Sequence, residues 1–266
     1  MSLFAVLALA IGFADLARGA KIRGVPSVVP VMVGAIITTL VGVLAALTSV
    51  TDILLLLVII IVLIGWVVFG DRALQKPTSR VWAGAAVTVL AVGAAATVGF
   101  SGGTTPVGGA FADWLHWTAF PRLPGVATVQ APTQVLLIAG LLMVQLATGN
   151  LLVRLTLCLS GAPEASAIKD EPATRLKGGR MIGPMERLCI LGLGLAGEPT
   201  AAGIVIAAKG LIRWPELQAV RDAKAEHIDA KAEHIIDAVT EYFLVGSFAS
   251  WLVALASLAI VRLAWT

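Results

Sequence analysis

Four charged residues stand inside or beside apolar runs in the C-terminal third of this sequence. The stretch Leu176–Trp214 carries Glu186, Arg187, Glu198 and Lys209 among residues typical of a membrane span. An ionisable side chain at membrane depth needs a partner or a route to water. The cations of this stretch are therefore candidates for pairing with carboxylates or for binding an anionic group, and its carboxylates are candidates for transport or acid/base chemistry.

Two histidines suggest a metal site, but their spacing argues against one. The heptad DAKAEHI occurs twice within Arg221–Asp237, which places His227 and His234 seven residues apart. On a helix this separation is about 10.5 Å, whereas two helical ligands of one metal need a spacing of three or four residues. We expect no metal site and interpret 215–238 as a charged cytoplasmic helix, with a partner-binding or pH-responsive arm as the alternative.

Asp113 and His116 form a second polar pair, in the aromatic segment 111–120 of a Gly/Pro-rich loop. They are spaced for an acid/base pair, but the loop supplies neither a nucleophile nor a third group. Trp114 and Trp117 favour an interfacial helix at headgroup level, with the pair as its polar edge.

Asp15 and Arg18 lie three residues apart at the end of the first apolar run. This spacing predicts a salt bridge within one helix.

Motifs of soluble enzymes are absent from the sequence. It contains no phosphate-binding loop, zinc-protease motif, nucleophile elbow or dinucleotide fingerprint, and Cys158 and Cys189 form no metal-ligand or disulfide pattern. We therefore predict no catalytic residue and no cofactor, and the sequence favours a protein that is not an enzyme.

Composition identifies the class of protein. Of the 266 residues, 58% are hydrophobic and 13% charged, and the mean hydropathy is +0.94. No soluble core of this size needs so many apolar residues, so we predict an all-α, polytopic transmembrane bundle in a single domain. The first run has no cationic segment before it and is expected to be a retained helix. The net charge of +3 follows from where the cations lie, and nucleic acid is not expected as a partner.

The apolar runs predict about eight spans. They are expected at 3–17, 26–50, 53–69, 81–100, 134–157, 185–197, 199–214 and 240–261. The small residues of 83–99 predict close helix packing in the fourth span.

The distribution of cations predicts the orientation. Three loops, near Arg18, near Arg72 and from Arg154 to Arg187, hold twelve Lys and Arg residues, and the loops of the other side hold one, Arg122. Because basic loops stay in the cytoplasm, we expect the N-terminus outside.

The span count depends on the segment 185–214. As a single helix it would be about 45 Å long, and Gly197-Glu198-Pro199 interrupts it midway. Proline suits the first position of a helix and glutamate suits its N-terminus, so we predict a hairpin of two short helices. One helix here would give seven spans and would leave many more cations outside.

The C-terminal third also resembles a known family. The stretches GGRMIGPMERLCIL, GIVIAAKGLIRWPEL and TEYFLVGSFASWLVAL are similar to the C-terminal membrane region of bacterial proteins grouped as domain of unknown function 3307. The resemblance implies a bacterial inner-membrane location and no particular activity. The positions that carry it are Gly179, Arg180, Ile182, Gly183, Glu186, Arg187, Ala207, Ala208, Lys209, Arg213, Glu241, Tyr242 and Gly246.

On the predicted topology, a charged collar forms at the inner ends of the last three spans. Its members are Arg180, Glu186, Arg187, Lys209, Arg213, Glu241 and Tyr242. A salt-bridged collar would fix the depth of the hairpin, and a basic pocket there would bind an anionic lipid headgroup or a phosphate.

Three classes of function remain open. A non-catalytic membrane partner or scaffold with this collar is favoured. The first alternative is a transporter of small solutes or ions that uses the broken hairpin around Glu198. The second is a membrane enzyme acting on a lipid-linked phosphate, for which Glu186 and Glu241 are the only acid/base candidates at the right depth.

Overall fold

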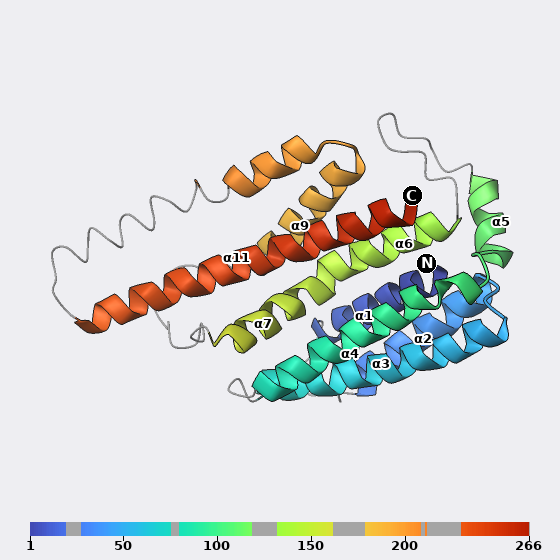
Figure 1. Cartoon of the computed structure of the whole chain (residues 1–266), viewed down its shortest axis with the longest axis horizontal. Coiled ribbons are helices and arrows are strands. Elements are labelled where there is room, and N and C mark those ends of the chain that lie inside the picture. The colour runs from blue at the N-terminus through green and yellow to red at the C-terminus, as the bar shows by residue number, and fades with distance from the viewer. Residues whose placement is uncertain are drawn as a thin grey trace.

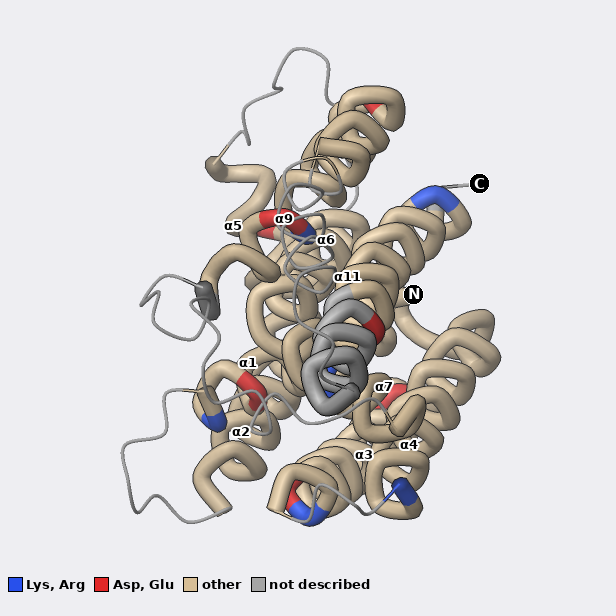
Figure 2. Tube along the Cα trace, turned by 90° about the vertical axis from the view of Figure 1, so that its left-hand side faces the viewer, with Lys and Arg blue, Asp and Glu red and all other residues tan. Residues whose placement is uncertain are grey.

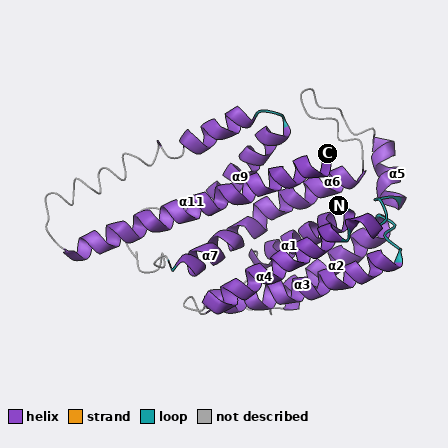
Figure 3. Cartoon of the chain, in the orientation of Figure 1, coloured by secondary structure: helices purple, strands orange, loops and turns teal. Residues whose placement is uncertain are grey.

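The computed structural model describes residues 1–19, 28–75, 80–118, 132–161, 179–208, 211 and 230–265, and these form helices and no strand (Figure 3). The helices are α1 (Ser2–Gly19), α2 (Val28–Leu44), α3 (Val50–Gln75), α4 (Arg80–Gly99), α5 (Gly109–Thr118), α6 (Pro132–Met143), α7 (Gly149–Ser160), α9 (Gly179–Leu195) and α11 (Ala230–Trp265). A π-helical turn, η2 (Val144–Thr148), joins α6 to α7, a 3-10 turn, η1 (Ser101–Gly103), follows α4, and a further short helix spans Pro199–Ala208.

Five of the described helices are long and apolar enough to cross a membrane. They are Ser2–Gly19, Val50–Gln75, Arg80–Gly99, Pro132–Ser160 and Leu244–Ala264. Val28–Leu44 and Pro199–Ala208 are apolar but shorter. Within the described residues the predicted all-helical fold is confirmed, and five long apolar helices fit the predicted membrane protein. The count of eight spans stays a prediction.

Helix α1 lies at the centre of the first part of the bundle, as Figure 1 shows. It is buried over most of its surface and packs against α2, α3, α4, α6 and η2. Small residues allow this close approach, because a side chain at Gly140 would meet the backbone oxygen of Ala5 at 2.9 Å. The first apolar run is therefore the centre around which the other helices are arranged.

The small residues of α4 form the predicted packing surface. Ala83, Ala86, Gly93 and Thr97 are buried at helical spacing, and α4 packs most extensively against α3. A Cβ atom at Gly93 would lie 2.7 Å from the side chain of Val62 on α3. Close contact between these helices depends on the absence of a side chain at this position.

The predicted hairpin turn is present after α9. Gly197 has a left-handed backbone (φ +85°), and the Glu198 and Gly197 N–H groups donate to the carbonyls of Leu193 (2.9 Å) and Gly194 (3.3 Å). This is the Schellman ending of a helix. A new helix follows from Pro199, and Ile190, Ala202 and Ala254 pack α9, this helix and α11 together.

Several helix boundaries differ from those predicted, among them those of α9 and α11. Helix α9 begins at Gly179 rather than at 185, with Pro184 inside it. Proline removes only one hydrogen bond near a helix start, so the helix extends past it. Helix α11 runs without a break from Ala230, so the second heptad copy continues into the last span and is not a separate helix ending at 238. Only one glycine, Gly246, falls within α11, and no proline does.

Charges gather at the end of the bundle opposite the N-terminus. Arg18 ends α1, Arg72 lies in the last turn of α3, and Arg80 begins α4. Figure 2, which views the molecule from this side, shows basic residues at the ends of α3 and α4. Three described cations of the predicted cytoplasmic loops therefore share one end, while α5 and both chain termini lie toward the other (Figure 1).

Candidate functional site

The guanidinium of Arg187 is buried inside the C-terminal half of the bundle. Only 1% of the residue is exposed. Its Nε and Nη2 atoms donate to the carbonyl oxygen of Gln145 at 3.1 and 2.9 Å, and Nη2 also donates to Asn150 Oδ1 at 2.7 Å. Nη1 donates to the Ser250 hydroxyl at 3.0 Å. Four hydrogen bonds to neutral oxygens thus compensate for the loss of water around this cation.

The helix opposite Arg187 is shaped to receive the guanidinium. Gln145 lies in the π-turn η2, and a π-turn interrupts the regular helical ladder and makes its carbonyls accessible to outside donors. The next residue after the turn is Gly149, where a Cβ atom would lie 2.6 Å from the Arg187 Nε. The π-turn therefore supplies the acceptor, and the glycine supplies the space.

Helix α11 completes the site. Besides Ser250, it contributes Ser257, whose hydroxyl accepts a hydrogen bond from Gln145 Nε2 at 2.7 Å. Gln145 is fully buried, and its Oε1 atom has no hydrogen-bond partner among the described residues. The α6–η2–α7 segment, α9 and α11 are thus held together by one network around Arg187.

The depth of Arg187 corrects the predicted collar. Gln145 lies close to the middle of Pro132–Ser160, a segment long enough to cross the membrane. An arginine bonded to Gln145 therefore lies deep in the bundle and not at the ends of the helices, where the collar is expected. The sequence predicts Arg180 and Arg187 at one level because the helix is expected to start at 185, whereas α9 starts at Gly179.

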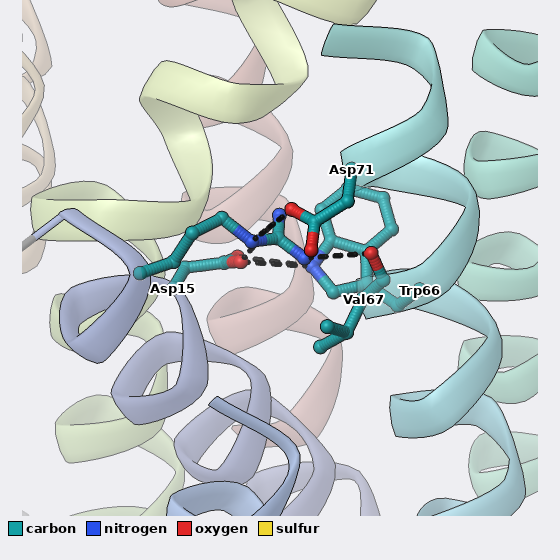
Figure 4. A network of polar contacts seen from close by, with 5 residues as sticks. Asp15, Trp66, Val67 and Asp71 are labelled. Carbon is teal, nitrogen blue, oxygen red and sulfur yellow. Dashed lines mark hydrogen bonds and ion pairs between the residues drawn. The ribbon is translucent and has the colours of Figure 1, made fainter. Parts of the chain in front are cut away.

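A second buried network surrounds Asp15 and confirms the predicted salt bridge. Arg18 Nη1 lies 3.2 Å from Asp15 Oδ1, and Arg18 Nε lies 3.3 Å from Asp71 Oδ1 (Figure 4). The indole Nε1 of Trp66 donates to both oxygens of Asp15 at 3.1 and 3.0 Å, and Arg18 Nη2 donates to the Val67 carbonyl at 3.2 Å. Two carboxylates thus share one guanidinium where α1 meets α3.

The π-turn η2 connects the two networks. The buried hydroxyl of Thr148 faces the Asp15 carboxylate without a hydrogen bond of standard geometry. Gln145, at the other end of the same turn, binds Arg187. A buried cation and a buried carboxylate therefore lie at the two ends of the same five-residue π-turn.

The other collar residues are placed only in part. Glu186 is half-buried and interacts electrostatically with Arg187. On α11, Glu241 is exposed and Tyr242 is half-buried. Lys209, Arg213 and the side chain of Arg180 lie outside the described residues, so the collar without Arg187 stays a prediction.

Glu198, the transport candidate, is exposed at the hairpin turn. Its backbone carbonyl accepts from the Ala202 N–H at 3.2 Å, so the residue caps the helix that follows. It lines no described cavity.

The remaining candidate residues are the acid/base pair on α5 and the two histidines of the repeated heptad. Asp113 and His116 are both exposed on α5. His227 and the side chain of His234 lie outside the described residues. Within the described part of the chain, no group of three His, Cys, Asp or Glu residues could hold a metal ion.

Sequence reasoning missed the partners of Arg187, and it found only Asp15 among the partners of Arg18. Gln145, Thr148 and Asn150 do stand out as polar residues inside an apolar span, and Ser250 and Ser257 mark one face of another. Polar residues in a span tend to contact other helices, so this signal was present. Nothing local links Trp66 or Asp71 to α1, because that contact depends on tertiary packing.

Comparison of the chain with protein-family models, with curated proteins and with solved structures gives no match. The resemblance of the C-terminal third therefore stays a prediction.

The fit between Arg187 and Gly149 can be tested by a double-mutant cycle. We expect Arg187→Ala to destabilise the protein by about 3 kcal/mol or more, since it leaves several buried acceptors without donors. Gly149→Ala should cost about 1–3 kcal/mol alone, because its methyl group meets the guanidinium. In the Arg187→Ala background the same change should cost almost nothing.

The measurement is reversible unfolding in detergent, followed by circular dichroism. Arg154→Ala, at an exposed position of α7, is the matched control and should stay within about 0.5 kcal/mol of the parent. An equal cost of Gly149→Ala in both backgrounds would show that the two residues do not interact.

Proposed function

We propose that this protein acts without catalysis, as a partner or scaffold for another membrane protein, in the bacterial inner membrane that the resemblance implies. The observation that carries the proposal is that the two faces of α11 differ in their side chains. One face is lined by small and hydroxyl-bearing residues and is buried on the Arg187 site. The buried residues are Ser247, Ala249, Ser250, Ala254, Ser257 and Val261.

The opposite face of α11 carries a stripe of large apolar side chains. Leu244, Phe248, Leu252, Leu255 and Leu263 are exposed and recur at the helical period. Such a stripe faces either lipid or another transmembrane helix. Its position supports a helix partner, because the Arg187 network fixes the rotation of α11 and so fixes where the stripe points.

The bonding of the charged side chains also supports a role in joining helices rather than in catalysis. Arg187 and Arg18 direct their nitrogens to acceptors within the chain, and Asp15 receives Arg18 and Trp66. A general acid or nucleophile must reach a substrate, and these buried groups are used to join helices instead.

Site-directed crosslinking tests the partner proposal. A photoreactive amino acid replaces Leu252 on α11 or, as the control, Val92 at an exposed position of α4. In native membranes we expect Leu252 to capture one protein in stoichiometric yield, because partner helices pack on the stripe, and Val92 to capture only lipid. Equal capture of proteins at both positions, or of lipid alone at both, would contradict the proposal.

The collar residues other than Arg187 extend the proposal to an anionic lipid headgroup. Arg180, Lys209 and Arg213 are the cations that remain there, with Glu186, Glu241 and Tyr242 as neighbours on the predicted topology. Basic residues just inside the membrane attract acidic lipids. Such a lipid would sit at the inner surface beside the partner-binding face.

Native mass spectrometry of the gently solubilised protein tests the headgroup site. Lys209→Ala should lose a bound acidic phospholipid, because the change removes the deepest collar cation. Arg221→Ala, which removes a cation outside the collar, should retain it. Equal retention in both variants would show that Lys209 binds no headgroup.

A second candidate function is transport of a small solute or ion, and one observation favours it. Arg187 and Asp15 are buried charges of opposite sign that face the same π-turn, where Gln145 Oε1 has no hydrogen-bond partner among the described residues and Thr148 faces Asp15. Buried ionisable residues and interrupted helices are common on transport pathways. This candidate moves the transport site from Glu198 to the π-turn.

Flux assays in reconstituted vesicles test the transport candidate. If the π-turn is the pathway, ion or proton flux should be lost in Arg187→Gln and in Asp15→Asn, because each removes a buried charge. It should persist in Glu198→Ala, where an exposed cap is changed. Absence of flux in the parent protein would reject transport, and loss only in Glu198→Ala would return the site to the hairpin turn.

A further inference from the structure

A hollow of about 340 Å³ lies beneath α5, at the end of the bundle that carries the N-terminus. Its walls come from four helices that are distant in sequence. They include Leu9 of α1, Val41 and Leu44 of α2, Phe111 and Trp114 of α5, and Ala139 of α6. The volume falls at the lower end of the range for small-molecule sites, about 300–1,000 Å³.

The lining of the hollow is apolar throughout. Water is stable inside a protein only where it finds about two to four polar partners, so water does not suit this space. The rings of Phe111 and Trp114 are 6.2 Å apart and lie over one side of it. The hollow therefore favours a hydrocarbon occupant.

Helix α5 is fixed in place above the hollow. The Gly108 N–H donates to the Ala45 carbonyl at 3.0 Å, which ties the start of α5 to the end of α2. Gly109 adopts a left-handed backbone (φ +60°), and a Cβ there would lie 3.0 Å from the Ala46 Cβ. Helix α5 is thus held over the hollow by the backbone contacts at its start.

Hydrogen bonds also fix the segment that precedes α5. Asp52 is fully buried and accepts hydrogen bonds from the Ser49 N–H at 3.1 Å and the Thr105 N–H at 3.2 Å, as well as from the Thr105 hydroxyl. In return, the Asp52 N–H donates to the Ser49 hydroxyl oxygen at 3.1 Å, which makes a capping box at the start of α3. Ser2 at the start of α1 donates to the Thr105 carbonyl at 3.1 Å.

The hollow is continuous with a surface suited to lipid. On α2, Met32, Ile36, Leu40 and Val43 are exposed at helical spacing, and Leu44 both lines the hollow and is itself 38% exposed. Trp117 of α5 is 82% exposed, as expected of a tryptophan at headgroup level. A hydrocarbon chain that lies along α2 would therefore reach the hollow beside Leu44.

We propose that this hollow is a binding site for one acyl chain of a membrane phospholipid, in the leaflet on the N-terminal side. The chain enters sideways along α2 and lies between α2 and α6 with its end over Leu9, while α5 covers it. The inference requires only that the helices cross a bilayer, and it stands apart from the partner proposal.

Photolabelling tests the site in the full-length protein. The protein is reconstituted into phosphatidylethanolamine and phosphatidylglycerol vesicles that contain a trace of phosphatidylcholine with a diazirine on one acyl chain. After illumination, mass spectrometry should find the label concentrated on the α2, α5 and α6 peptides that line the hollow. An even distribution over all exposed spans would show ordinary bilayer contact and overturn the proposal.

Two matched variants separate the site from the surrounding lipid. Ala139→Phe fills the hollow and should abolish labelling of the lining peptides while labelling elsewhere is unchanged. Ala91→Phe adds the same ring at an exposed position of α4 and should leave the pattern as in the parent. Unfolding midpoints verify that both variants are folded, and persistence of the lining label in folded Ala139→Phe would overturn the proposal.

Discussion

A guanidinium in an apolar interior must be supplied with acceptors, and this requirement organises the C-terminal half of the molecule. Removing an ion from water costs several kcal/mol even after relaxation, so an arginine without partners would not remain buried. Here Arg187 donates two hydrogen bonds to the backbone carbonyl of Gln145, one to Asn150 and one to Ser250. The π-turn and Gly149 are the local irregularities that make this arrangement possible.

Polar contacts also specify how the N-terminal helices fit together. Between helices in a bilayer there is little hydrophobic driving force, because lipid tails are as apolar as leucine, so packing alone defines position weakly. Asp15 sets the register of α1 against α3 through Trp66 at one end. At the other end of the two helices, Asp52 of α3 accepts a hydrogen bond from the Thr105 N–H, and Ser2 of α1 donates to the Thr105 carbonyl. The apolar residues between these two contacts can then interlock in only one register.

Local features were predictable from the sequence, and distant contacts were not. The Asp15–Arg18 pair and the turn at Gly197 each depend on residues a few positions apart, so spacing and turn chemistry were sufficient. The apolar runs likewise indicated most of the helices, because hydropathy is summed within one segment. The depth of Arg187 was not predictable, because it depends on where α9 begins and on a π-turn more than forty residues earlier, for which no local sequence signal is known.

The bonding of Arg187 also distinguishes the two functions that its position suggests. A transport site must release its ligand, so its charges need free donors or acceptors in at least one conformation. Four N–H groups of Arg187 are already bonded to two other helical segments, α6–η2–α7 and α11, and freeing them together would separate α9 and α11 from the π-turn. At about 1.5–3 kcal/mol for each bond to a charged group, this change is too costly without a ligand that replaces the bonds. The closed network therefore favours a fixed α11 surface for a partner over a moving pathway.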